Sequence, residues 1–137
     1  MADDEIAVFW EKAVRALRSS RAQDVDVDSA FSVAYNASLQ GATAVLLGAG
    51  YRAVGRDHHH SIFAGVAALE AGELSRAARD ADDMRQDRHN TYYGAVMIEL
   101  AQLAEMQDVA GRLLAAGHAW LADARPGLNL TDPTPLG

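Results

Sequence analysis

Apolar residues recur at intervals of three and four positions along most of this chain, a spacing typical of amphipathic α-helices. Residues 5–21 carry the clearest stripe, formed by Ile6, Phe9, Trp10, Ala13, Val14 and Leu17. Similar spacing predicts four more helices, over residues 29–48, 58–71, 73–94 and 95–124. Abundant alanine and an aromatic content of only 7% suit close-packed helices rather than sheets. The sequence therefore predicts an all-α, up-down bundle of about five helices.

The chain of 137 residues is long enough for one ordinary domain with its own core. Residues 1–124 are predicted to form this domain, because Pro126 stops the last helix and residues 125–137 lack a periodic apolar face. We therefore expect residues 125–137 to form a flexible tail. Residues 29–48 are apolar on most sides, which predicts a helix at the centre of the bundle or in an oligomer interface.

Composition excludes several classes of protein. The chain has no cysteine, so it forms neither a disulfide framework nor a thiolate metal site. It has no apolar run of the roughly 20 residues that a membrane-spanning helix needs, and its N-terminus is acidic where a signal peptide would be basic. These features predict a cytoplasmic protein without membrane contact. A net charge of −7 argues against tight non-specific binding to nucleic acid, so any phosphate recognition must be local.

Residues 73–94 carry the most unusual pattern of the chain. Projected as one helix, their apolar arc contains Leu74, Ala77, Ala78, Ala81 and Met84. Arg85, Arg88 and Tyr92 fall on the same arc, with His89 at its margin, whereas most of the aspartates point the other way. Arginine on an inward face requires a hydrogen-bonding or anionic partner, which is either an internal carboxylate or a ligand.

Alternation of helix direction would bring four helix ends together at one pole of the bundle. These are the end of 29–48, the start of 58–71, the end of 73–94 and the start of 95–124. Two of them are helix N-termini, which attract anions. We therefore expect a nucleotide or RNA phosphate to bind at this pole, in contact with Arg52, His59, Arg85, Arg88, His89, Asn90 and Tyr92.

The consecutive histidines His58, His59 and His60 suggest a metal site, but their spacing argues against one. Successive helical residues diverge by about 100°, and helical two-histidine metal sites use a separation of four residues. We therefore predict neither a metal site nor a cofactor, and expect these histidines to cap the helix or to contribute to the pole.

Two segments, AYNASLQGATAVLLGAGYR at 34–52 and DDMRQDRHNTYYG at 82–94, resemble the HEPN domain family. The resemblance implies a small helical bundle that forms a homodimer. It also implies a role in systems that pair such domains with a nucleotidyltransferase, a toxin or an antitoxin. Some members of the family are metal-independent ribonucleases.

The ribonuclease motif of this family is only partly matched. Arg88 and His89 fit its arginine and polar positions, but Tyr93 stands where the motif has a histidine. Histidine transfers protons near neutral pH, whereas tyrosine, with a pKa of about 10, is a poor base. We therefore expect a phosphate-binding module without strong catalysis. One alternative is an endoribonuclease that uses Arg88, His89 and Tyr93. The other is a protein–protein interaction module in which the arginines form internal ion pairs.

Overall fold

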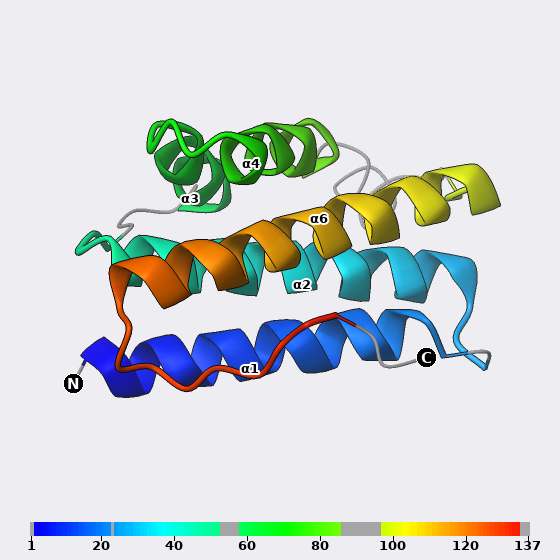
Figure 1. The fold of residues 1–137 in the computed structure, drawn as a ribbon. Helices are drawn as coiled ribbons and strands as arrows, with labels where there is room; N and C mark the ends of the chain where they lie inside the picture. The colour runs from blue at the N-terminus through cyan, green and yellow to red at the C-terminus, as the bar shows by residue number, and fades with distance from the viewer. Residues whose placement is uncertain (1, 23, 53–57, 86–96, 135–137) are drawn as a thin grey trace.

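The computed structural model describes residues 2–22, 24–52, 58–85 and 97–134. These residues form five α-helices and no strand (Figure 1): α1 (Ala2–Ser20), α2 (Val27–Gly48), α3 (His58–Ala67), α4 (Glu73–Asp83) and α6 (Leu100–Ala124). The all-α bundle predicted from the apolar periodicity is thus confirmed for this part of the chain.

Local hydrogen bonds explain where several helices begin. The carboxylate of Asp26 caps α2 by accepting the backbone N–H of Ser29 at 2.7 Å. Glu99 and Gln102 form a reciprocal capping box at the start of α6. Because residues 97–99 are not helical, the predicted helix start near residue 95 is wrong.

The prediction of one helix over residues 73–94 is also wrong. α4 ends at Asp83, and the backbone N–H of Met84 closes it by bonding to the carbonyls of Asp80 and Ala81. Residues 86–94 lie outside the described part of the chain. The third helix is likewise shorter than predicted, since α3 ends at Ala67.

α2 lies at the centre of the bundle and contacts α1, α3, α4 and α6. This confirms the first of the two positions expected for a helix that is apolar on most sides. Small residues let α6 approach closely. A Cβ on Gly41 would overlap the side chain of Leu114, and a Cβ on Gly48 would lie 2.5 Å from Leu121. The close contact of α2 with α6 therefore depends on glycine.

α2 and α6 run in the same direction, which contradicts the predicted up-down alternation (Figure 1). Gly41 lies beside Leu114 and Gly48 beside Leu121, so residue numbers rise together along the two helices. The backbone nitrogen of Ile98 also donates to the carboxylate of Asp28, which joins the starts of both helices. Helices alternate in direction when short loops connect them. Here α3 and α4 come between α2 and α6 in the sequence, so the chain has returned to the starting end of α2 before α6 begins.

The residues after α6 lie along α1 (Figure 1). The indole nitrogen of Trp10 donates to the backbone carbonyl of Thr131 at 2.8 Å, and His118 Nε2 lies 3.2 Å from the carbonyl oxygen of Leu130. Leu128 and Leu130 pack against the core. Through residue 134, the segment that the sequence predicts to be a flexible tail thus contacts the bundle.

None of the helices in the described ranges is both long and apolar enough to cross a membrane.

Candidate functional site

The predicted pole is divided in the structure. The start of α6 lies beside the start of α2, through the bond between Asp28 and Ile98, and therefore away from the end of α2. Of the other three helix ends, the end of α4 lies at the first turn of α3, whereas Leu46 near the end of α2 packs against Gly65 later in α3. Arg52, just after α2, lines the same pocket as His58, and Asp82 near the end of α4 contacts His60. The first turn of α3 is thus the centre of the candidate site.

Two of the three histidines of this turn have rings in contact. His58 lines a pocket between α1, α2 and α3, and its ring lies edge-on to that of His59, with centroids 5.1 Å apart. His59 Nδ1 lies 3.3 Å from the hydroxyl of Tyr35, and His60 Nδ1 lies 2.8 Å from a carboxylate oxygen of Asp82. The divergence expected from the helical increment is thus seen for His60, but not between His58 and His59. The part of the chain that the structure describes contains no group of three or more acidic, histidine or cysteine side chains arranged to hold a metal ion.

The side chains of His60, Asp82 and Arg85 form a cluster that we call the Asp82 corner. One carboxylate oxygen of Asp82 contacts His60, and the other accepts a hydrogen bond from Arg85 Nε at 3.1 Å. The side chain of Asp82 is only 21% exposed, whereas that of Arg85 is 43% exposed. Arg85 is thus partly buried and pairs with a carboxylate of the protein, which is one of the two partners expected for it. The projection that placed Arg85 on the apolar arc assumed an unbroken helix, and α4 ends two residues before Arg85.

Arg52 contacts α1 rather than the Asp82 corner. Its guanidinium donates to the carboxylate of Glu5 at 2.8 Å, and both side chains are exposed. This hydrogen bond lowers the pKa of Glu5 and raises the pKa of Arg52. A phosphate would have to compete with Glu5 for Arg52.

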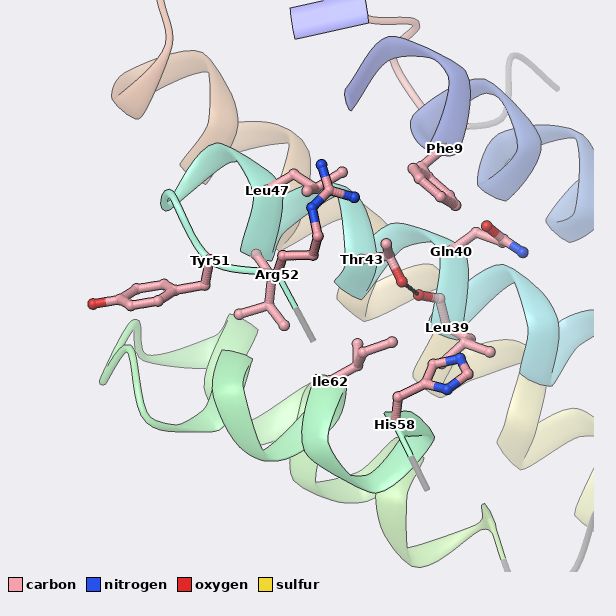
Figure 2. A pocket seen from close by; sticks show the side chains of 10 residues that line it. Phe9, Leu39, Gln40, Thr43, Leu47, Tyr51, Arg52, His58 and Ile62 are labelled. Carbon is pink, nitrogen blue, oxygen red and sulfur yellow. Dashed lines mark hydrogen bonds between the residues drawn. The ribbon is translucent and has the colours of Figure 1, made fainter. Parts of the chain in front are cut away.

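A pocket of about 220 Å³ lies between α1, α2 and α3 (Figure 2). Its described lining is half apolar, from Phe9, Leu39, Leu46, Leu47 and Ile62, and half polar, from Gln40, Thr43, Tyr51, Arg52 and His58. The hydroxyl of Thr43 donates to the carbonyl of Leu39 at 2.7 Å. The amide oxygen of Gln40 is buried without a hydrogen-bond partner. An acceptor left in this state is costly, so Gln40 marks the pocket as a place where a ligand can be stabilised.

Sequence reasoning missed this pocket. Phe9 belongs to the apolar stripe of α1, and Gln40 and Thr43 are two of several polar residues in a mostly apolar helix. The side-chain amide of Gln40 was the signal in the sequence that could have indicated the pocket, because a buried amide needs hydrogen-bond partners.

The remaining predicted site residues lie outside the described part of the chain. These are Arg88, His89, Asn90, Tyr92 and Tyr93, which include all the residues expected to act in a ribonuclease.

Comparisons of the chain with protein-family models, curated proteins and solved structures find no significant match. The similarity to HEPN domains, which extends over roughly residues 5–124 with a short diagnostic motif, thus stays a resemblance.

Proposed function

We propose that this protein is an HEPN-like module that binds the phosphate of a nucleotide or of RNA at the Asp82 corner, without strong catalysis. The observation that carries the proposal is the shared contact of His60 and Arg85 with Asp82. It brings an arginine that follows α4 and a histidine of α3 to one partly exposed place, at the N-terminus of α3. The protein otherwise carries a net charge of −7, so such a local cluster is the kind of site that phosphate requires.

The guanidinium of Arg85 can serve Asp82 and a ligand at the same time. An arginine side chain carries several N–H donors, and the contact with Asp82 uses Nε. The first-turn N–H groups of α3 and its helix dipole add a second attraction for phosphate. Asp82 itself repels an anion, so we expect binding to be moderate and to weaken as salt is added.

The proposal extends to the residues that follow Arg85 in the sequence. Arg88 and His89 are expected to complete the phosphate site, as the partly matched HEPN motif implies, together with Asn90 and Tyr92 from the predicted pole. Tyr93 in place of a histidine supports binding rather than cleavage.

The test is the binding of a fluorescently labelled, 5′-phosphorylated RNA, measured by anisotropy. We expect Arg85→Ala to weaken binding at least tenfold, since a hydrogen bond between charged groups contributes about 1.5–3 kcal/mol. Arg15→Ala is the matched control, because Arg15 pairs with Glu11 on the exposed face of α1. Equal affinity of the two variants would reject the proposal, as would absence of binding by the unaltered protein. After incubation in EDTA the RNA should remain intact, and its cleavage would favour the ribonuclease.

A second candidate function is protein–protein association. Met97 is 77% exposed and Leu100 is 72% exposed at the start of α6, which is unusual for large apolar side chains. A homodimer, or a complex with a nucleotidyltransferase or antitoxin, would cover them. Sedimentation of the unaltered protein and of Leu100→Glu tests the homodimer, and we expect the variant to be monomeric. If both the unaltered protein and the variant are monomeric, the homodimer is rejected, and a complex with a different protein is the remaining form of this function.

A further inference from the structure

We propose that the pocket between α1, α2 and α3 holds a nucleobase, and that adenine fits its polar groups best. This inference rests on the proposed function, because the base would belong to the nucleotide whose phosphate binds at the Asp82 corner. Four features of the pocket support it: its size, its aromatic walls, its charge and the unpaired amide oxygen of Gln40.

The size and the walls of the pocket suit a single flat ring system. Its volume of about 220 Å³ lies below the roughly 300–1,000 Å³ of pockets that enclose drug-sized ligands. Phe9 of α1 and His58 of α3 lie on opposite sides of it (Figure 2). Nucleobases stack on aromatic side chains, including phenylalanine and histidine. Leu39 and Ile62 supply apolar contacts between the two rings.

The charge of the pocket favours a neutral group over a phosphate. Arg52 is the charged residue among its described lining residues, and its guanidinium is already paired with Glu5 at 2.8 Å. A phosphate in the pocket would have to break this pair. A base leaves the pair intact and still gains the apolar contacts.

Gln40 supplies the groups that can read the edge of a base. Its amide oxygen is buried without a partner, and its amide nitrogen lies 3.5 Å from Asn36 Oδ1, which is long for a hydrogen bond. The terminal torsion of glutamine is broad, so the amide can rotate towards the pocket at little cost. A glutamine amide presents one donor and one acceptor, the pattern that pairs with N6 and N7 of adenine.

The first turn of α3 connects this pocket with the Asp82 corner. His58 lines the pocket, whereas His60, two residues later, contacts Asp82 on the side of α4. A nucleotide with its base beside His58 would therefore carry its phosphate past the N-terminus of α3, which attracts anions.

The experiment measures the binding of adenosine, uridine and tripolyphosphate to the full chain by titration calorimetry. We expect adenosine to bind more tightly than uridine. His58→Ala should weaken adenosine about tenfold or more through loss of stacking, and Gln40→Leu about three- to tenfold through loss of hydrogen bonds. His60→Ala is the matched control from the same turn, and it should leave adenosine affinity unchanged while weakening tripolyphosphate. Circular dichroism checks that each variant keeps its helices.

The outcomes separate this inference from the proposed function. Tripolyphosphate binding without adenosine binding would overturn the base pocket and leave the phosphate site standing. Adenosine binding that depends on His58 and Gln40, without tripolyphosphate binding, would keep the pocket and reject the phosphate site. Adenosine binding that neither His58→Ala nor Gln40→Leu weakens would place the base elsewhere and overturn the inference. If neither adenosine nor tripolyphosphate binds, both the base pocket and the phosphate site are rejected.

Discussion

The carboxylate of Asp28 accepts a hydrogen bond from the backbone nitrogen of Ile98, 70 residues later, at 2.8 Å. The bond holds the start of α6 beside the start of α2, and Ile98 itself is buried. The parallel arrangement of these two helices thus has a specific polar contact at one end, in addition to the close packing at Gly41 and Gly48.

Loss of this bond should destabilise the protein. We expect Asp28→Ala to lower the free energy of unfolding by about 1–2 kcal/mol, because the N–H of Ile98 loses its acceptor and α2 loses a favourable charge in its first turn. Urea denaturation measures the change. Asp24→Ala, at an exposed position in the same connection, should cost less than about 0.5 kcal/mol. Equal losses in the two variants would show that the bond to Ile98 contributes nothing.

Two glycines should respond to alanine with opposite signs. Gly41→Ala places a methyl group against the buried Leu114, and we expect a loss of about 1–3 kcal/mol from overpacking. Gly111→Ala meets only Arg21, with its guanidinium nitrogen at 3.6 Å, and should gain up to about 1 kcal/mol from the higher helix propensity of alanine. Thermal unfolding of both variants checks the signs. A stabilising Gly41→Ala would contradict the close approach of α2 and α6.

Removal of residues 126–137 tests the packing of the tail on α1. The indole N–H of Trp10 would lose Thr131 as its acceptor, and the core would lose its contacts with Leu128 and Leu130. We expect the truncated chain to be less stable by about 2–3 kcal/mol. In a Trp120→Phe background, the emission of Trp10 should also shift to longer wavelength as its ring gains contact with water. Asn129→Ala, at an exposed tail position, serves as the control, and unchanged stability of the truncated chain would speak for a tail that does not pack.

Stability should fall in acid partly through Glu73. A hydrogen bond from Arg112 lowers the pKa of Glu73 below its ordinary value of 4.5, so the folded protein binds a proton there less readily than the unfolded chain. The stabilisation is therefore present above about pH 4.5 and is lost as the pH falls through the lowered pKa. We expect the stability difference between the unaltered protein and Glu73→Gln, measured in urea, to shrink as the pH falls from 7 to about 3. An Arg112→Ala background should make this difference smaller at pH 7, and a difference that is independent of pH would contradict the pair.

Apolar periodicity predicted the buried faces of α1 and α4, although Met97 and Leu100 on the apolar stripe of the last predicted helix are exposed. The stripe of α1 is in the core at Ile6, Trp10 and Leu17, and the arc of α4 is buried at Leu74, Ala81 and Met84. These assignments hold because a helical face follows from local spacing alone.

The direction of α6 could not be derived in the same way. Periodicity identifies a buried face but not the end of the bundle at which a helix starts. That information lies in pairs such as Asp28 with Ile98 and Gly41 with Leu114, which are far apart in the sequence. The pole expected from alternation was divided for this reason.

Helical geometry could predict side-chain directions only within one turn, and only in part. His60 diverges from His58 as the helical increment requires, but the rings of His58 and His59 meet. The projection could not be extended to Arg85, because it continues only as long as the helix, and Met84 closes α4. The pocket was missed because Phe9 and Gln40 come from different helices and meet only after packing.

The passage of the chain through α3 and α4, between two parallel helices, has an architectural consequence. α1, α2 and α6 pack together as a three-helix scaffold, to which Phe9 and Gln40 belong. His58, His60 and Arg85, which are also proposed to bind ligand, belong to the intervening segment. That segment can be exchanged or lengthened in a related chain as long as it retains an apolar surface matching α2 and α6. New binding chemistry can therefore arise in this architecture by insertion, with the three-helix scaffold left as it is.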